Sequence, residues 1–306
     1  MADYSYIGTG KVYVKDANTA GGLVEVGNCS KLEFSVDEDA IELRDYTSPG
    51  GGVLNEVRRV TGVTASMTLH ELKPENIAIM LYGSASAVTG DTLTDEAVTG
   101  YRGSLSRLLH ANPTAVTVEA TNGKAATAWE ATTAYSLNAY KVPATPNGYY
   151  YRCSTAGTSH SSAPSWPTTL GATVNDGTAV WTNMGKVTLV ADTDYEVRPG
   201  GIFFLAAGNV TNGQGFLVDY TFGAEDVIQA LTQAAKEYAL CFEGLNEAQS
   251  GKPFLVDAFR VRFGATKAFS LIGDAFAGFE LTGKVLKDTT KSGSGISQFF
   301  KATSVQ

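Results

Sequence analysis

The stretch DYTSPGGGVLNEVRRVTGVTASMTLHEL, residues 45–72, joins a loop-forming segment to a strand with a clear pattern. Pro49 is followed by three glycines, which restrict the backbone less than any other residue type. From residue 63 onward every second residue is apolar, namely Val63, Ala65, Met67 and Leu69. A period of two is typical of a strand with one buried face, so we expect a sheet strand beside a flexible loop.

The same alternation recurs along the chain. It is found in KLEFSVD (31–37), GFLVDYTF (215–222), FLVDAFRVRF (254–263) and AGFELTGKVL (277–286). In the third of these we expect a buried face made of Leu255, Phe259, Val261 and Phe263. Strands with one solvent-exposed face and one buried face are typical of antiparallel sandwiches and barrels.

Helical patterns are few. PENIAIMLYG (74–83) starts with a proline, carries Glu75 in its first turn and closes at Gly83, which predicts a short helix. DVIQALTQAAK (226–236) is a second candidate, but its pattern is too short to decide. We therefore predict a mainly β protein: an antiparallel β-sandwich or barrel with a flanking α-helix, plus a small all-β inserted domain.

The insertion is predicted from composition. Residues 127–185 hold all three tryptophans and four of the nine prolines, and their four charged residues sum to zero. Strand-like segments, AVTVEATNGK (115–124) and KVTLVADTDYEV (186–197), flank this part. Since hairpin tips tolerate insertions, we predict a discontinuous main domain, 1–125 and 186–306, and a surface-exposed inserted domain at 126–185.

Composition also limits the function. No run of eighteen apolar residues is present, so we expect no membrane insertion. The first ten residues lack the basic and apolar regions of a signal peptide, so we expect the protein to assemble in the cytoplasm. Cys29, Cys153 and Cys241 show no paired spacing, which favours reduced thiols over a disulfide framework or a zinc site. The net charge of −8 argues against tight nucleic-acid binding, which requires a basic face.

No catalytic motif is complete. HELKP (70–74) lacks the second histidine of a metalloprotease helix, and Pro253 follows Gly251-Lys252 where a phosphate loop needs Ser or Thr. The glycines at 50–52 lead into a strand, so no helix N-terminus presents amides to a phosphate. We therefore expect no enzyme activity, no cofactor and no metal.

The order of several motifs carries a resemblance. VGNCSKLEFSVDED (26–39) precedes the DYTSPGGG loop, and the helix PENIAIMLYG and the strand VDYTFG (218–223) follow; EGLNEAQSGKPF (243–254) and FELTGKVLKD (279–288) come last. In this order the chain resembles major tail tube proteins of long-tailed bacteriophages. The resemblance implies hexameric rings that stack into a hollow tube in the virion tail. It also implies as partners the chain itself, the tape measure, tail terminator and baseplate proteins, and passing DNA that is not bound tightly.

Two groups of residues are candidates for that role. Acidic side chains beside the first alternating strand are candidates to face and repel DNA in the lumen: Glu33, Asp37, Glu38 and Asp39. The glycine-rich loop is the candidate inter-subunit element, disordered in the free chain and ordered against a neighbour; its residues are Tyr46, Thr47, Ser48, Pro49, Gly50, Gly51, Gly52, Val53, Leu54, Asn55 and Glu56. The alternative is an ordinary mobile hairpin tip.

The predicted insertion resembles small carbohydrate-binding modules. Tyr149, Tyr151 and Trp166 are its candidate glycan contacts, because aromatic faces stack on the apolar faces of sugars. A unit of sixty residues also needs aromatic side chains for its own core, so the same residues have a purely structural alternative. A glycan-binding adhesin without tube formation is the alternative function, and a cell-wall hydrolase is a third, for which no acid/base pair stands in a recognisable motif.

Overall fold

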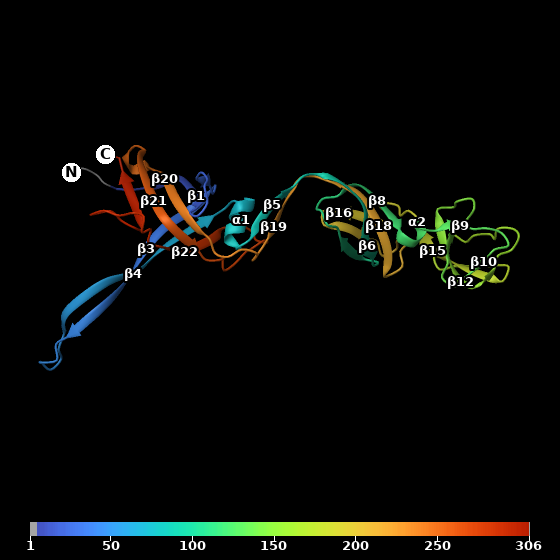
Figure 1. Ribbon diagram of the computed structural model, residues 1–306, viewed down its shortest axis with the longest axis horizontal. Helices are drawn as coiled ribbons and strands as arrows, with labels where there is room; N and C mark the ends of the chain where they lie inside the picture. Colours follow the sequence, from blue (N-terminus) through green and yellow to red (C-terminus); the bar gives the residue numbers. More distant parts are fainter. Residues whose placement is uncertain (1–4, 306) are drawn as a thin grey trace. The chain divides into compact units, whose positions relative to one another are not determined.

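Antiparallel strands make up most of the protein in the computed structural model, which describes residues 5–305 (Figure 1). This confirms the predicted fold class at the level of a mainly β protein with several antiparallel sheets and few helices. The chain divides into two compact units. The first unit runs up to Ser86 and resumes at Asp226, and the second unit is Ala87–Glu225.

One eight-stranded sheet builds the first unit. Its order is β2-β1-β20-β21-β22-β4-β3, and β23 pairs with β21 beside this path. The bounds are β1 Gly8–Asp16, β2 Val24–Glu25, β3 Cys29–Arg44, β4 Val53–Leu69, β20 Glu237–Asn246, β21 Lys252–Phe263, β22 Phe279–Val285 and β23 Phe300–Ser304. A 3-10 turn, η1 (Glu247–Gln249), connects β20 to β21. The order begins at β2 and ends at β3, so the path does not close on itself.

The core of this unit lies on the apolar face of the sheet. Met67 and Leu69 of β4, Phe279 and Leu281 of β22 and Val12 of β1 are at most 2 % exposed. Helix α1 (Pro74–Met80) adds Ile77 and Met80 to the same cluster. The predicted helix and the predicted buried faces of β4 and β22 are therefore confirmed.

The structure corrects one sequence prediction in this unit and decides one element that the sequence left open. In β21 the predicted Val261 and Phe263 are buried, but Val256 and Ala258 are buried in place of Leu255 and Phe259, which alternate onto the other face. The cause is a register shift opposite Tyr238 and Leu240 of β20, which reverses the facing of the strand. Residues 226–236 form no helix: β19 (Glu225–Gln229) pairs with β5 (Ser84–Val88), and a non-helical segment follows.

The second unit contains four small sheets. Two are three-stranded: β6 (Asp91–Gly100), β18 (Gln214–Phe222) and β8 (Thr114–Ala120); and β16 (Tyr195–Arg198), β17 (Gly201–Phe204) and β7 (Ser104–Arg107). A five-stranded sheet has the order β14 (Thr173–Asp176), β15 (Ala179–Lys186), β12 (Tyr149–Thr155), β11 (Tyr140–Val142) and β9 (Thr127–Ala128). The last is β10 (Ala134–Tyr135) with β13 (Gly157–Thr158), and α2 (Thr121–Lys124) is a single turn.

The division of the chain differs from the predicted one. Residues 87–125 and 186–225, which we expected in the main domain, belong to the second unit. They form its larger core, in which Val118, Phe204 and Phe216 are fully buried. The predicted insertion at 126–185 lies within this unit and has a smaller aromatic core of its own. One insertion therefore sits inside another.

The flanks of the inner insertion pair as the sequence indicated. The backbone N–H of Ala120 donates to the Val187 carbonyl at 2.7 Å, and the N–H of Leu189 donates to the Val118 carbonyl at 2.9 Å. Glu119 and Thr188 form an antiparallel bridge between these two bonds. The two strand-like flanks thus close a hairpin whose tip has been opened to admit the inserted part.

Candidate functional site: the projecting hairpin

Strands β3 and β4 continue beyond the core of the first unit and form a projecting arm (Figure 1). We define the arm as residues 38–60 and the root of the hairpin as residues 29–37 and 62–69. Every residue of the two strands in the arm is exposed, whereas alternate residues of β4 in the root are buried. The arm therefore extends beyond the cover of its own sheet.

The arm carries apolar side chains on one face. Ile41 pairs with Val57 and Leu43 with Asn55, so alternation places Ile41, Leu43 and Val57 together. These three side chains are 50–55 % exposed. Such a cluster, with no cover from the described part of its own chain, is typical of a surface that binds another protein.

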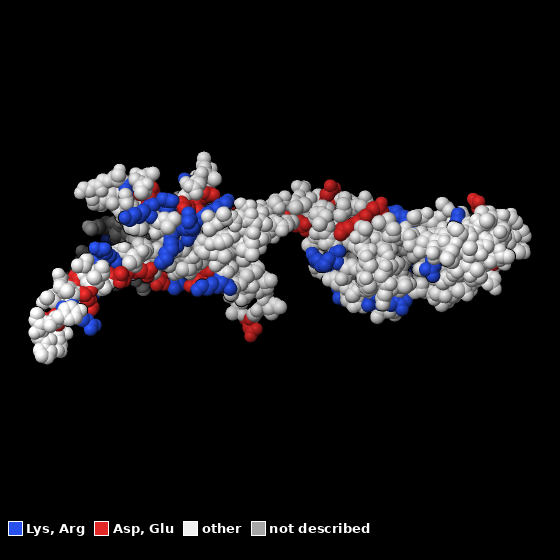
Figure 2. Space-filling model, turned by 60° about the horizontal axis from the view of Figure 1, so that its bottom comes forward, with Lys and Arg blue, Asp and Glu red and all other residues white. Residues whose placement is uncertain are grey.

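The other face of the arm is charged. Arg58 forms an ion pair with Glu56 of the same strand, and its Nη1 lies 3.9 Å from Glu38 Oε2 across the hairpin. Figure 2 shows red and blue side chains mixed toward the base of the arm, and a mainly uncharged tip. The two faces therefore differ in chemistry, although the Asp39–Arg59 pair lies on the same face as Ile41 and Val57.

The loop at the tip is closed by hydrogen bonds of its own. The carboxylate of Asp45 accepts from the Thr47 hydroxyl at 2.6 Å, from the Thr47 N–H at 2.8 Å and from the Ser48 hydroxyl at 2.8 Å. These bonds, led by the Thr47 hydroxyl, lower the pKa of Asp45 from its ordinary value. The Asp45 N–H donates to the Gly52 carbonyl at 2.8 Å. This local network differs from our expectation of a loop that orders only against a neighbour.

The remaining predicted loop residues combine exposed apolar side chains with a turn that requires glycine. Tyr46 is 85 % exposed and Leu54 is 67 % exposed, although both are large and apolar. Gly50 has a φ of +86°, a conformation that favours glycine. A Cβ at Gly51 would lie 1.9 Å from the Asp45 carbonyl oxygen, so the sharp turn at this point requires glycine.

The four predicted lumen acids are exposed, and each lies near a cation. Glu33 forms an ion pair with Lys31 at 2.7 Å, and Asp37 forms one with Lys284 of β22 at 3.0 Å. Glu38 lies near Arg58, as described above, and Asp39 pairs in the sheet register with Arg59. The surface around these acids is therefore charge-balanced rather than uniformly acidic. Glu33, Asp37 and Asp39 lie on one face of β3 and Glu38 on the other. Lys284, Arg58 and Arg59 come from neighbouring strands, whereas Lys31 lies in β3 itself.

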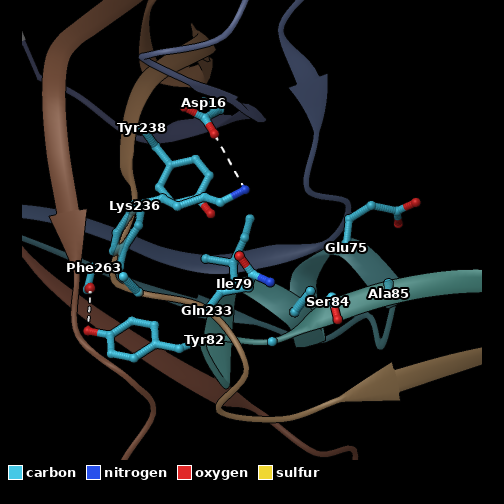
Figure 3. A pocket seen from close by; sticks show the side chains of 13 residues that line it. Asp16, Glu75, Ile79, Tyr82, Ser84, Ala85, Gln233, Lys236, Tyr238 and Phe263 are labelled. Carbon is cyan, nitrogen blue, oxygen red and sulfur yellow. Dashed lines mark hydrogen bonds and ion pairs between the residues drawn. The ribbon is translucent and has the colours of Figure 1, made fainter.

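A cavity of about 440 Å³ lies beside α1 in the first unit (Figure 3). Ile79 and Tyr82 line it from the α1 side, and Lys236 reaches across it to an ion pair with Asp16 at 3.6 Å. The Tyr82 hydroxyl donates to the Phe263 carbonyl at 2.8 Å. Lys236 is thus paired with Asp16, and the Tyr82 hydroxyl with the Phe263 carbonyl. Neither pair combines a nucleophile with a general base.

Residues 5–305 also contain histidines and possible metal ligands outside the arm. This part of the chain contains no cluster of three or more His, Cys, Asp or Glu residues that could hold a metal ion. His70 contacts the Ala277 carbonyl and the Ser30 hydroxyl, and His110 contacts Glu225 at 2.7 Å, so both have structural partners. No helix in the described range is both long and apolar enough to cross a membrane.

The aromatic residues proposed as glycan contacts belong mostly to a core. Tyr151 is 0 % exposed and its hydroxyl donates to the Pro167 carbonyl at 2.9 Å, so the prediction that it is exposed is wrong. Trp166 packs on Tyr151 with ring centroids 4.4 Å apart. Tyr149 is partly buried. The structural alternative therefore accounts for these side chains, since the inserted part needs them to exclude water from its core.

A buried carboxylate, which the sequence analysis missed, organises this core. Asp176 is 2 % exposed, and its Oδ2 accepts from the indole N–H groups of both Trp129 (2.7 Å) and Trp181 (3.0 Å). Its Oδ1 accepts from the backbone N–H of His160 at 2.8 Å. The signal in the sequence was Asp176-Gly177, a turn dipeptide five residues before Trp181.

A second missed feature is the Asp45 network at the tip of the arm. Aspartate followed within three residues by Thr and Ser favours a turn in which the carboxylate binds the following N–H and hydroxyl groups. Local sequence was therefore sufficient to find it.

The comparisons with known proteins give a family without an assigned role. The family model described as "Protein of unknown function UCP028589" matches residues 5–144 and 172–303, and the chain belongs to this family. No curated protein matches the chain. The unmatched residues 145–171 lie within the inner insertion and include Tyr149, Tyr151 and Trp166.

Proposed function

We propose that this family member is the structural subunit of a phage-type tail tube, which stacks as hexameric rings around a conduit for DNA. The observation that carries the proposal is the arm: two strands that leave the core with an uncovered apolar face of Ile41, Leu43 and Val57. A folded chain exposes such a face at a cost in solubility, and a copy of the same chain is the partner present at the highest concentration during assembly.

Strand edges add a second support. β3 lies at the end of the sheet order, so in the described residues its outer edge has no partner strand. An unpaired edge of sixteen residues is a template for another strand, and monomeric proteins normally keep such edges short or covered. A polymerising subunit uses the edge for contacts between copies.

The charge pattern suits a surface past which DNA moves. Lys31, Lys284 and Arg58 are paired with acids, so they offer phosphates few free cations. Tight DNA binding requires several unpaired cations, each of which releases counterions. We therefore infer that DNA passes this surface with little attraction, through balanced charge in place of a uniformly acidic lining.

The second unit has a decorating role in this proposal. Two of the three predicted glycan contacts, Tyr151 and Trp166, pack against each other in its aromatic core. The geometry therefore favours the tube subunit over the adhesin. Tape measure, tail terminator and baseplate proteins are the proposed partners at the ends of the tube, and the proposed place is the virion tail.

Electron microscopy of the purified chain tests the proposal, with Ile41→Asp/Val57→Asp as the arm variant. We expect hollow tubes from the unchanged chain and none from the arm variant, because two carboxylates cannot be buried in an apolar contact. Val197→Asp in the second unit is the matched control, since Val197 is also exposed (43 %), and it should leave the tubes intact. Tubes of normal length from the arm variant would refute the role of the arm.

A further inference from the structure

The loop between β21 and β22, residues 264–278, exposes the largest uncovered apolar side chains of the first unit. Ile272 is 98 % exposed, Phe276 is 99 % exposed and Leu271 is 73 % exposed. Single exposed apolar residues are ordinary, but three within six positions of one loop form a patch that water solvates poorly. A loop with this composition is typical of a segment that is buried in a partner.

The base of this loop is fixed. The Thr266 N–H donates to the Met80 carbonyl at the end of α1 (2.8 Å), and the Gly264 N–H donates to the Thr282 carbonyl (2.8 Å). Phe269 packs on Phe279 of the core, with ring centroids 5.3 Å apart. The exposed tip is therefore held by a rigid base, which lowers the entropy that a partner must overcome.

An open groove with a mixed polar and apolar lining lies elsewhere in the same unit. It has a volume of about 810 Å³ and runs between β1 and β3, with Leu32, Phe34, Phe242, Phe254 and Val256 in its lining. Among the described residues, the edge of β3 along the groove has no partner strand, and β2 pairs with β1 only at Tyr13 and Val14, outside the groove. The groove thus offers apolar side chains together with free backbone groups.

The loop and the groove lie at opposite ends of β21. Phe254 and Val256 line the groove near the start of the strand, and the loop begins directly after its last residue, Phe263. Seven to nine residues of strand separate the two places by about 23–30 Å at the usual rise per residue. None of the groove-lining residues comes from the loop, so a chain does not fill its own groove.

Neither place carries a net charge, because Lys267 balances Asp274 within the loop and Lys31 is paired with Glu33 in the groove lining. Asp274 is the only charged residue among 268–278, at the tip of the loop. Lys31 lines the groove and lies at its rim, 51 % exposed and paired with Glu33. No net charge at either place therefore opposes the entry of the apolar neighbours Ile272 and Phe276 into the groove.

We propose that the loop 264–278 of one copy occupies the β1–β3 groove of the next copy. The contact joins two different surfaces, so repetition along the strand direction produces an open stack of copies. This inference rests on the proposed function, because it identifies the contact that holds successive rings together.

The first test changes the tip of the loop. Ile272→Asp/Phe276→Asp should leave the melting temperature of the free chain unchanged, because both side chains are already in water, and should reduce the yield of tubes at least tenfold. Leu231→Asp is the matched control, since Leu231 is 75 % exposed outside the loop and has a φ of +58°, which Asp tolerates. Unchanged tube yield from the loop variant would overturn the inference.

The second test identifies the contact. Chains with Ile272→Cys are mixed with chains carrying Thr9→Cys, a groove-lining position, and are oxidised under assembly conditions; both also carry Cys29→Ser, because the native Cys29 thiol lines the same groove. Mass spectrometry should find the disulfide between residues 272 and 9 of different copies, and Leu231→Cys should give none. Tubes without this disulfide would overturn the inference and leave the proposed function standing. If the unchanged chain forms no tubes, the proposed function fails, and the disulfide between copies decides the loop–groove contact by itself.

Discussion

The root and the arm of the β3–β4 hairpin belong to the same two strands, yet their apolar residues lie on opposite faces. In the root, Leu32 and Phe34 pack toward the core while Glu33 and Asp37 face outward. In the arm, Ile41 and Leu43 lie on the same face of β3 as Glu33 and Asp37. The pattern changes beside a bulge, where the register moves from Asp37–Gly62 to Glu38–Val60. One hairpin thus carries a folding surface followed by an exposed apolar surface, which is the surface that we propose for assembly.

This difference gives each half of the hairpin its own response to mutation. Apolar groups in the root contribute to the free energy of unfolding, because water is excluded there within one chain. Apolar groups in the arm contribute little to that free energy, because about half of each side chain stays exposed. In our proposal a second copy covers them. The following substitutions separate the two contributions.

Met67→Ala in the root should have the largest effect. Met67 is 1 % exposed within the core cluster, and removing such a side chain costs about 2–5 kcal/mol. Chemical denaturation followed by fluorescence measures the change. Val57→Ala in the arm is the control and should shift unfolding by less than about 0.5 kcal/mol. Equal effects of the two substitutions would show that the arm is part of the folding core.

Lys284→Ala should have a smaller effect on the root. Its Nζ contacts Asp37 Oδ2 at 3.0 Å and the Thr64 hydroxyl at 3.1 Å on the polar face of the sheet. Exposed ion pairs of this kind contribute about 0–1 kcal/mol. The same denaturation experiment measures it, with Lys267→Ala in the loop as a control. A loss of unfolding free energy as large as that of Met67→Ala would show that Lys284 and Asp37 are not an ordinary exposed ion pair.

The smallest and most local effect should be a pH-dependent change in the stability of the loop at the tip of the arm. The pKa of Asp45 is lowered by its hydrogen bonds with Thr47 and Ser48, so the loop is stabilised above the ordinary aspartate value of about 3.9 and loses this stabilisation as the pH falls through the lowered pKa. NMR should show the Thr47 amide titrating with a midpoint below that value, and Asp45→Asn should abolish the titration. A midpoint above it would mean that the network is absent in solution.

Short-range pattern was enough to predict several elements. Alternation located β18, β22 and the root of β4, and the proline start of α1 identified the helix, because each depends on residues close in sequence. The glycine-rich tip was also placed correctly between two strands. The arm as such was not predicted, because exposure depends on where the rest of the sheet ends.

The errors arose where distant segments decide the outcome. The facing of β21 depends on its register with β20, and the boundary at Ala87 depends on strands on both sides of the inner insertion sharing a core. In β12, Tyr150 and Tyr151 are both buried, in two different cores. Successive strand residues face opposite sides, so a strand with a core on each side buries both, whereas a lone inserted domain would expose one of them.

Cryo-electron microscopy of the concentrated, purified chain tests the central claim most directly. The account predicts hollow tubes of stacked rings in which the arm of each copy, with Ile41, Leu43 and Val57, is buried against another copy. A chain that stays monomeric at every concentration, with its arm in solvent, would contradict it.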